Sequence, residues 1–397
     1  MLIPLSAARS ATCGSKAAAL GTLLRAGLPV PDGVVVPFET QQGGVQTCGA
    51  APAGLSSTLQ GELAQALTAW GDPHVAVRSS AATEDTAEAS AAGQYESVLG
   101  VHGAVAVGQA VQQCWAAAGA AHAADYWAHL TGAASLERPA MAVIVQQLVD
   151  ATASGVMFTR PGPDASTRIE ASWGLGLAVV GGTVTPDSWQ LRPGQPAEVH
   201  LGRKATRTDR RECGTGLATT PVPRALQDVP AISESTARTL AALGEDVAAV
   251  LGRPQDIEWA VAGGRVWLLQ SRPVTAAPPP PPDQLARQSG RALTGTPGAR
   301  GTARGPARVL RSMAEAGRVE SGDIVVCRYT DPAWTPLFRV AGGIVTETGG
   351  VLSHAAIVAR EHRIPAVLGV PEATSAIPDG STIAIDGTAG SVTLSST

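Results

Sequence analysis

Five consecutive prolines, Pro278 to Pro282, divide the chain into two unequal parts. Proline has a fixed φ angle and no amide hydrogen, so a run of prolines is excluded from the interior of a helix or of a central strand. It favours an extended polyproline II segment, which rises about 3.1 Å per residue and acts as a stiff spacer. The tract therefore predicts a first domain over residues 1–275, a linker over 276–290 and a second domain over 291–397.

The first domain has the pattern of a mixed α+β fold. Short apolar runs bounded by glycine or proline are typical of strands, and longer runs with apolar residues three and four positions apart are typical of helices. These patterns predict helices over 15–26, 56–70 and 103–130, and strands over 28–37, 74–79, 141–148, 154–159, 167–172, 256–261 and 265–270.

The second domain is smaller, and strand and helix patterns interleave along it. Its size, about 100 residues, is enough for one compact core. The patterns predict strands near 304–310, 323–327, 343–346, 365–368, 382–385 and 391–394, and helices near 312–318 and 353–362.

The charge and the apolar content of the chain exclude several classes of protein. Lys and Arg number 29 against 33 Asp and Glu, so the net charge of −4 gives no overall attraction to nucleic acid or to an anionic membrane. Hydrophobic residues make up 44% and charged residues 16%, which indicates a globular chain. No window approaches the roughly 18 apolar residues of a membrane span. From the charge and this absence together, we expect a protein that binds neither nucleic acid nor a membrane.

The cysteines indicate the compartment. They are five in number, widely separated and never spaced as CxxC. This pattern predicts neither a disulfide framework nor a zinc site, and it fits a reducing compartment. The N-terminus also lacks a basic leader followed by a sustained apolar run, so we expect a cytoplasmic protein.

A first candidate for chemistry is the run GGVLSH at 349–354, which leads directly into the helical pattern AAIVAREH. Two glycines allow a tight turn and Ser353 is a predicted N-cap, which places His354 in the first helical turn. Free amide groups and the helix dipole favour an anion there, so His354 could carry a phosphoryl group. The same pattern also fits a capped helix whose histidine only packs or hydrogen-bonds.

A second candidate is the strand VAVRSS at 75–80, which ends in Arg78 and two hydroxyl groups and continues into a loop of small residues with Gly93. Backbone amides of such a loop can approach the oxygens of a polyphosphate, and a guanidinium can chelate them. The spacing differs from that of a P-loop, and small-residue loops are common in a chain this rich in alanine and glycine.

A third candidate is the pair of strands DIEWA at 256–260 and VWLLQSRP at 266–273, which are joined by a Gly-Gly turn. A hairpin would bring Glu258 and Gln270 to one end of a sheet with Arg272 beside them. Carboxylate and amide oxygens are ligands that Mg²⁺ prefers. An ordinary hairpin with polar ends is the alternative.

Several separated stretches agree on one family. The segments 14–33, 75–101, SGVMFT at 154–159, IEASWGLG at 169–176 and 254–273 resemble the ATP-binding domain of phosphoenolpyruvate synthase, pyruvate phosphate dikinase and rifampicin phosphotransferase. The segment 329–370, which includes the SHAA helix, resembles the swivelling phosphohistidine domain of the same enzymes and is closest to the rifampicin phosphotransferase version. The resemblance implies an ATP-grasp-like nucleotide-binding domain followed by a small swivelling β/α phosphohistidine domain.

The resemblance also implies the chemistry and the residues that perform it. The β-phosphoryl group of ATP passes to a histidine with release of AMP and phosphate, and from the histidine to an acceptor. His354 matches the phosphocarrier nucleophile, and Glu258 and Gln270 match ligands of Mg²⁺. The positions that match nucleotide-binding or phosphate-binding residues are Lys16, Arg78, Gly93, Ser97, Gln146 and Arg272, with Ser97 in place of the family's usual threonine.

The acceptor is left open by the sequence. Rifampicin phosphotransferase carries a large acceptor domain between its two phosphoryl-handling domains, and the other two enzymes carry a barrel after the histidine domain. This chain has a linker at the first place and ends at Thr397. Three alternatives follow: an enzyme that phosphorylates a small molecule, a phosphocarrier subunit that serves a separate acceptor-binding protein, and a non-catalytic nucleotide-binding relative. Because Lys16, Arg78, Glu258, Arg272 and His354 are all present, the third alternative is disfavoured.

Overall fold

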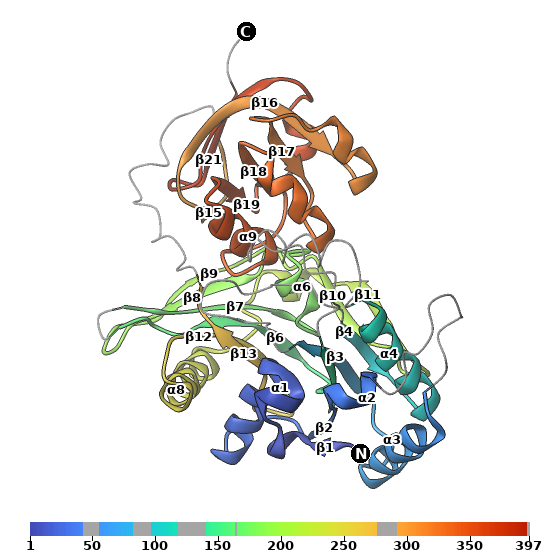
Figure 1. Ribbon diagram of the computed structural model, residues 1–397. Coiled ribbons are helices and arrows are strands. Elements are labelled where there is room, and N and C mark those ends of the chain that lie inside the picture. Colours follow the sequence, from blue (N-terminus) through green and yellow to red (C-terminus); the bar gives the residue numbers. More distant parts are fainter. Residues whose placement is uncertain (43–54, 82–96, 118–139, 163–164, 276–291, 395–397) are drawn as a thin grey trace.

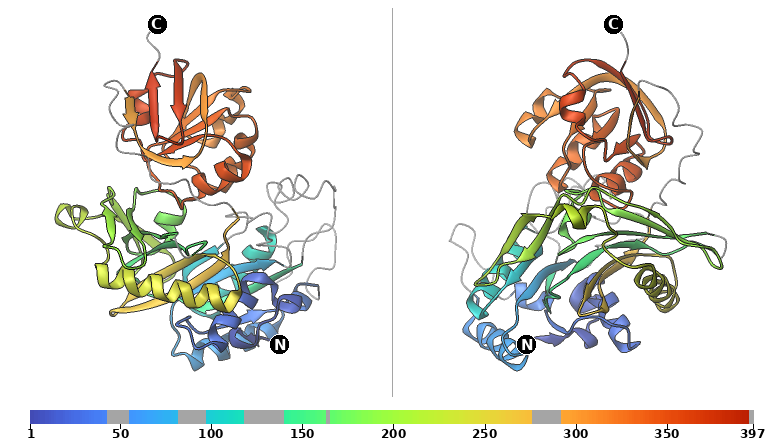
Figure 2. Two further views of the ribbon diagram at one scale, coloured as in Figure 1. Left: turned by 90° about the vertical axis from the view of Figure 1, so that its left-hand side faces the viewer. Right: turned by 180° about the vertical axis from the view of Figure 1, so that it is seen from behind.

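The structure, a computed structural model, contains three sheets of five or more strands and a separate two-stranded hairpin among its described residues. The C-terminal part, coloured orange to red in Figure 1, sits on the loops of the preceding part, with α9 facing α6. Two further views show the same arrangement from the side and from behind (Figure 2). The described residues are 1–42, 55–81, 97–117, 140–162, 165–275 and 292–394, so the predicted linker lies outside them.

The first sheet is antiparallel and has the strand order β1-β2-β5-β3-β4. Its helices follow the expected periodicity: α3 buries Leu59, Leu63 and Leu67 at intervals of four, and the hydroxyl of Ser56 caps it by accepting the amide of Leu59 at 3.2 Å. The elements are β1 Ile3–Pro4, α1 Ser10–Arg25, β2 Gly33–Val36, α2 Phe38–Gln42, α3 Ser57–Ala69, β3 Val75–Ala81, β4 Ser97–Val101, α4 Ala104–Ala117 and β5 Met141–Gln147.

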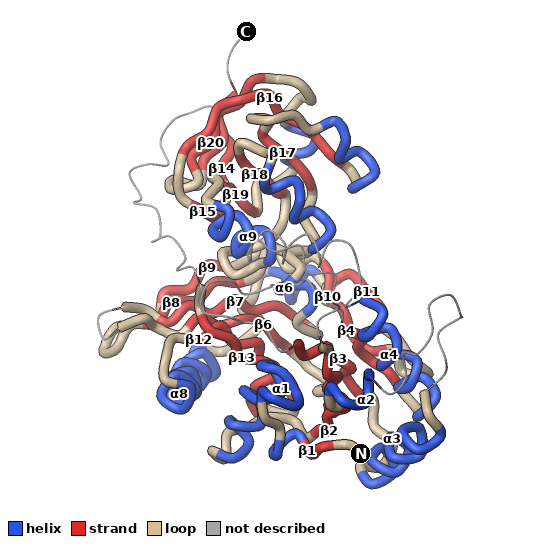
Figure 3. Tube along the Cα trace, in the orientation of Figure 1, coloured by secondary structure: helices blue, strands red, loops and turns tan. Residues whose placement is uncertain are grey.

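The second sheet has the strand order β13-β12-β6-β7-β8-β9 and is also antiparallel. The long helix α8 packs on it, and a hairpin of β10 and β11 extends from it toward the first sheet. Figure 3 shows these strands as one curved layer. The elements are β6 Ala153–Phe158, β7 Thr167–Trp173, α6 Leu177–Val180, β8 Asp187–Leu191, β9 Glu198–His200, β10 Thr206–Arg210, β11 Leu217–Pro221, α7 Arg224–Gln227, α8 Glu234–Leu251, β12 Gln255–Ala262 and β13 Arg265–Pro273.

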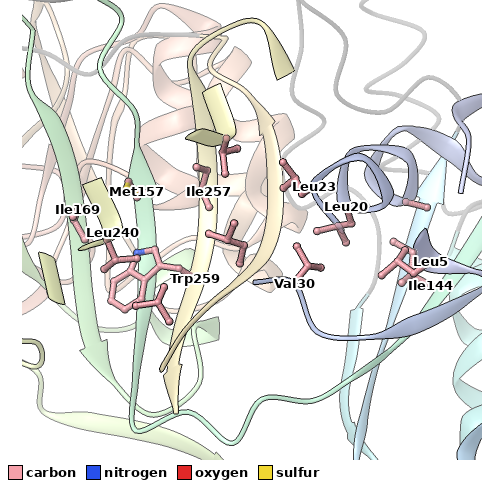
Figure 4. Close-up of a cluster of buried hydrophobic side chains, with 14 of the residues drawn as sticks. Leu5, Leu20, Leu23, Val30, Ile144, Met157, Ile169, Leu240, Ile257 and Trp259 are labelled. Carbon is pink, nitrogen blue, oxygen red and sulfur yellow. The ribbon is translucent and has the colours of Figure 1, made fainter. Parts of the chain in front are cut away.

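One hydrophobic core joins these two sheets. Leu20 and Leu23 of α1 and Ile144 of β5 belong to the same buried cluster as Ile257 and Trp259 of β12 (Figure 4). Burial of large apolar side chains is the main favourable term in folding, at about 25 cal/mol per Å². Helix α1 therefore ties the two sheets into one unit with polar strand ends between them.

The C-terminal part is built on one sheet with the order β14-β21-β20-β16-β17-β18-β19-β15. Strands β16 to β19 are parallel, and the two edge strands are consecutive in the chain, so the sheet curls back on itself. The elements are β14 Ala292–Thr294, β15 Thr296–Ala299, β16 Thr302–Leu310, β17 Ile324–Cys327, β18 Gly343–Thr346, α9 His354–His362, β19 Ala366–Leu368, α10 Ala373–Ala376, β20 Thr382–Asp386 and β21 Ser391–Leu394, with 3₁₀ segments at Met313–Arg318 and Pro332–Arg339.

Most predicted elements are present, and the differences have local causes. The strand predicted over 28–37 is limited to Gly33–Val36, because Pro29 and Pro31 cannot donate to a ladder. The helix predicted over 15–26 begins at Ser10, with a kink at Gly14 where φ is 79°. The helix predicted near 312–318 is a 3₁₀ segment. Residues 118–130 of the helix predicted over 103–130 lie outside the described residues, and sequence patterns missed β1, α2, β4, α6 to α8, β8 to β11, β14, β15, α10 and the 3₁₀ segment Pro332–Arg339.

Two general expectations concern cysteine and membranes. Cys13, Cys114, Cys213 and Cys327 are free thiols, in accord with the expectation of no disulfide framework among the described residues. Within the same residues, no helix combines the length and the apolar character that a bilayer crossing needs.

Candidate functional site

A cavity of about 530 Å³ lies where the two sheets of the first part meet. The cavity borders the C-terminal part, because Pro332 and Ala333 contribute to its wall. Seven of the nine predicted site residues line it, whereas Gly93 lies outside the described residues and His354 lies in the C-terminal part. The seven are Lys16 on α1, Arg78 on β3, Ser97 on β4, Gln146 on β5, Glu258 on β12, and Gln270 and Arg272 on β13.

The kink in α1 places Lys16 at this cavity. The helix is interrupted at Gly14, whose Cβ, if present, would overlap the backbone of Ser80. After the kink the amide of Ala17 donates to Oγ of Ser80 at 3.2 Å, which joins α1 to the end of β3. Lys16 is 7% exposed and lines the cavity beside this junction.

One side-chain oxygen of Glu258 and one of Gln270 lie close to the guanidinium of Arg78. The two residues are direct cross-strand partners in β12 and β13, so the predicted pairing is confirmed. Nη1 of Arg78 lies 3.5 Å from Oε2 of Glu258 and 3.4 Å from Oε1 of Gln270, and it donates to the carbonyl of Leu269 at 3.2 Å. Two oxygen donors that already face a common positive group have the chemistry that a hard divalent cation requires.

Arg272 forms a buried ion pair with Asp256, a residue that sequence reasoning did not select. Nε of Arg272 donates to Oδ2 of Asp256 at 2.8 Å, and the two residues are cross-strand partners. Burial raises the pKa of Asp256, while the charge of Arg272 opposes that rise. Asp256 and Glu258 are two positions apart on one strand, so alternation could have placed both carboxyl groups on the face that carries Gln270 and Arg272.

Gln146 and Ser97 complete the part of the cavity wall formed by the first sheet. Gln146 is 1% exposed, and its Nε2 donates to the carbonyl of Pro31 at 3.1 Å. Ser97 is exposed at the start of β4 and pairs with Arg78 of β3. The two residues thus lie on opposite sides of β3, which separates β4 from β5.

His354 is the first residue of α9 and is 5% exposed. Its Nδ1 lies 3.4 Å from Oγ1 of Thr330, and its Nε2 is buried with no hydrogen-bond partner among the described residues. Ser353 occupies the expected N-cap position, but the expected cap bond is absent within the described residues. Its hydroxyl donates instead to the carbonyl of Gly350 at 2.8 Å, which closes the turn before the helix.

Burial lowers the pKa of His354 to about 4, and the positive charge of Arg272 acts in the same direction. The imidazole is therefore neutral at neutral pH and keeps a lone pair. Below the ordinary histidine pKa of about 6.5 the unfolded chain binds a proton that the buried imidazole of His354 does not. The free energy of unfolding is therefore highest above about pH 6.5 and decreases as the pH falls toward 4. The shift in the pKa of His354 corresponds to a loss of about 3 kcal/mol in the free energy of unfolding across that pH range.

We expect His354 to show no imidazole titration above about pH 5. The measurement is NMR of protein with ¹⁵N-labelled histidine, with His354→Ala used to assign the signal. The signal of the exposed His200 is recorded in the same sample for comparison. An imidazole of His354 that protonates near pH 6.5 would contradict the buried position.

The loop before α9 is bound to the first part of the chain by hydrogen bonds and apolar contacts. Glu170 of β7 is 2% exposed, and its carboxylate accepts the amides of Val351 at 2.6 Å and Leu352 at 3.1 Å. The same loop also donates from the Thr348 hydroxyl to the carbonyl of Gly182 at 2.6 Å and from the Gly349 amide to the carbonyl of Val184 at 3.1 Å. The apolar contacts come from a cluster of Val156, Phe158, Val179, Val351, Leu352 and Ile357.

Glu170, Thr330 and Arg360 are candidate functional residues that the sequence analysis missed. Burial raises the pKa of Glu170 to about 7, and the amides of Leu352 and Val351 oppose the rise. Nη1 of Arg360 donates to the carbonyl of Val351 at 2.8 Å. Burial lowers the pKa of Arg360 to about 10, while the charge of Glu170 raises it. No spacing in the sequence connects β7 with the loop before α9, so only the fold reveals these contacts.

Comparison with known proteins identifies two family domains in this order. Residues 49–289 match the family described as pyruvate phosphate dikinase, AMP/ATP-binding domain. Residues 319–390 match the family described as PEP-utilising enzyme, mobile domain. The mixed sheets and helices and the order of the two matched domains agree with the predicted α+β fold class, in which an ATP-binding domain precedes a smaller mobile domain.

Three relatives illustrate the similarity. A probable phosphoenolpyruvate synthase of Methanothermobacter thermautotrophicus is 33% identical over 96% of this chain and 61% of its own length. The corresponding protein of Archaeoglobus fulgidus is 34% identical over 96% of the chain and 56% of its own length. The phosphoenolpyruvate synthase of Escherichia coli is 36% identical over 78% of the chain and 41% of its own length.

The chain thus spans about three fifths or less of the length of these relatives. The resemblance stated on sequence motifs is nevertheless confirmed for both domains and over most of the chain. The chain belongs to the family of phosphoenolpyruvate synthase and pyruvate phosphate dikinase, with an AMP/ATP-binding domain followed by the mobile domain of PEP-utilising enzymes.

Proposed function

We propose that the chain is an AMP-forming phosphotransferase of the dikinase type that carries a phosphoryl group on Nε2 of His354. The observation that supports this most directly is the state of that atom. Nε2 is buried, it belongs to a neutral imidazole, and the charge of Arg272 at the cavity acts on it. A neutral imidazole with a free lone pair is a competent nucleophile toward phosphorus.

The proposed first half-reaction transfers the β-phosphoryl group of ATP to His354. The lone pair of Nε2 forms a bond to the β-phosphorus of ATP, and the bond from that phosphorus to the oxygen bridging it to the α-phosphorus breaks, so AMP leaves with the electron pair. Water attacks the γ-phosphorus, the bond from the γ-phosphorus to the oxygen bridging it to the β-phosphorus breaks with its electron pair left on the β-phosphoryl group, and inorganic phosphate leaves. The step requires the tautomer with its proton on Nδ1, in which the N–H of Nδ1 donates a hydrogen bond to Oγ1 of Thr330 and Nε2 keeps the attacking lone pair.

The cationic residues of the cavity are proposed to neutralise the phosphates. Phosphoryl transfer depends mainly on positioning and on charge compensation, and Lys16, Arg78 and Arg272 supply three positive charges along one cavity. Glu258 and Gln270 are proposed to hold Mg²⁺, because their oxygens already converge on Arg78. When bound, that ion would draw charge from the phosphate oxygens.

Three further assignments are proposed: nucleotide-binding residues from the resemblance, domain limits from the proline tract, and the compartment from the cysteine pattern. Gly93, Ser97 and Gln146 bind the nucleotide, and of these Ser97 and Gln146 line the cavity. The domain limits are 1–275 and 291–397 with a linker between them, in keeping with the end of β13 at Pro273 and the start of β14 at Ala292. A cytoplasmic location agrees with the free thiols among the described cysteines.

The second half-reaction is proposed to pass the phosphoryl group to a small molecule. The relatives are named phosphoenolpyruvate synthase, which makes pyruvate the first acceptor to test. An alternative is a phosphocarrier that serves a separate acceptor-binding protein. The coverage of about three fifths or less of each relative favours testing this alternative in parallel.

The test of the proposed function uses the full chain, Mg²⁺ and ATP labelled at either the β or the γ position. We expect β label in acid-labile protein phosphate together with AMP, and γ label in inorganic phosphate. Transfer of γ label to the protein with formation of ADP would contradict the dikinase reaction. A metabolite screen that begins with pyruvate, and a pull-down from the native cell extract with mass spectrometry, then separate the two acceptor hypotheses.

A further inference from the structure

The loop that precedes His354 contains two amide groups that no helix can satisfy. Val351 and Leu352 lie before the first residue of α9, so their amides have no acceptor within that helix. Both are buried, and both donate to one carboxylate, that of Glu170 on β7. A buried amide must find an acceptor, so this carboxylate satisfies a requirement that the loop creates when it meets the first part of the chain.

Arg360 holds the same loop from the other side. Its Nη1 donates to the carbonyl of Val351, while the amide of Val351 donates to Glu170. The peptide groups around Val351 are therefore fixed between the guanidinium of Arg360 in the mobile part and the carboxyl group of Glu170 in the ATP-binding part. Both ends of the Val351 residue thus make a hydrogen bond to a side chain, which restricts the orientation of the loop.

Gly350 carries a second, independent sign of the same contact. Its φ angle lies outside the region that favours glycine, so its backbone conformation is open to alanine. The three atoms nearest to a Cβ built at this position all belong to the carboxyl group of Glu170, and they overlap it. Glycine is required at this position by the carboxylate and not by the turn. Gly349 differs, because its φ of 108° strains any other residue.

We propose that Glu170 is a positioning residue that docks the His354 loop at the ATP-binding cavity by accepting the amides of Val351 and Leu352, and that Gly350 admits its carboxylate. This inference rests on the proposed function for its catalytic consequence. The docking itself is a property of the two parts of the chain. Glu170 acts through the loop and contacts neither His354 nor the cavity residues by any hydrogen bond between described residues.

The first experiment measures docking without activity, by hydrogen exchange of the full chain. Glu170 is the acceptor of the Val351 and Leu352 amides among the described residues, so we expect Glu170→Ala to speed exchange of the peptide over 348–357 about tenfold or more. Glu170→Gln keeps one acceptor oxygen, so its exchange rate for this peptide should lie between that of the natural chain and that of Glu170→Ala. Unchanged exchange of this peptide in Glu170→Ala would overturn the inference, and nucleotide binding to each variant checks that the ATP-binding part is folded.

The second experiment is a double-substitution cycle on the rate of His354 phosphorylation from ATP. We expect Glu170→Ala to lower the rate about 10- to 100-fold with little change in the ATP concentration at half-saturation. Gly350→Ala should lower it about tenfold in the natural chain because its methyl group meets the carboxylate. In the Glu170→Ala background the same methyl group has room, so the additional loss should be close to none.

Gly349→Ala is the matched control for this cycle. Its strain comes from the backbone, so its effect should multiply with that of Glu170→Ala. If the effects of Gly350→Ala and Glu170→Ala also multiply, the two residues do not meet in the reactive arrangement and the inference fails. If no phosphoryl group reaches His354 in the natural chain, the proposed function fails, while the hydrogen-exchange result still decides the docking.

Discussion

Replacing His354 by alanine is expected to abolish transfer of the β-phosphoryl group to the protein. Loss of a nucleophile costs on the order of 10³- to 10⁶-fold in rate, because no other group takes over bond formation. His354 is not part of the cavity wall, so ATP binding should persist. The measurement is acid-labile protein label from β-labelled ATP, with AMP formation followed in the same samples.

The matched control is the other histidine of the same helix. His362 is the last residue of α9, at the end opposite His354. His362→Ala should therefore retain protein labelling and AMP formation. Label on the His354→Ala protein at the level of the natural chain would show that another side chain is the carrier, whatever the fate of the nucleotide.

The second large effect is expected at Arg272. Its guanidinium lines the cavity and its charge acts on His354, so Arg272→Ala should lower phosphorylation about 10³-fold or more, as removal of a phosphate-binding arginine does in other phosphoryl transfers. The substitution also leaves the buried Asp256 without its partner, which costs about 3–5 kcal/mol of folding free energy. Loss of rate and loss of stability must therefore be separated.

A paired variant makes that separation. In Arg272→Met with Asp256→Asn, the charge at both positions is removed and no buried ion is left unpaired, so the folding free energy should stay close to that of the natural chain. Phosphorylation should remain as low as in Arg272→Ala. Thermal unfolding and single-turnover labelling measure the two quantities. Labelling of the paired variant at the natural rate would show that Arg272 serves only to balance Asp256.

Local sequence patterns were sufficient for many parts of the site. The hairpin that brings Glu258 and Gln270 to one end of a sheet follows from two short strands around a Gly-Gly turn, although their direct pairing also needs a bulge between Glu258 and Trp259 that the turn does not set. The placement of His354 at the start of a helix follows from the GGVLSH pattern. These features depend on interactions between neighbours in the chain.

Local patterns were less informative where one motif meets another. Asp256 could have been selected from strand alternation, but its importance depends on Arg272, which lies opposite it in the sheet. The kink at Gly14 serves to bring α1 against Ser80 of β3, and only the packed structure shows that contact. The same holds for Thr330, whose hydroxyl meets Nδ1 of a histidine 24 positions further along the chain.

The sequence by itself determined the order of the two domains, most of their strands with the helices α1, α3, α4 and α9, and the residue types that can bind phosphate and carry a phosphoryl group. Only the tertiary structure decided that the His354 loop is docked and that Glu170 docks it, since the two amides and the carboxylate are 181 and 182 positions apart. The physical reason is the separation in sequence between the residues that make contact. Periodicity and turn chemistry reflect contacts within a few residues, whereas a buried amide donates to whichever acceptor the fold brings to it.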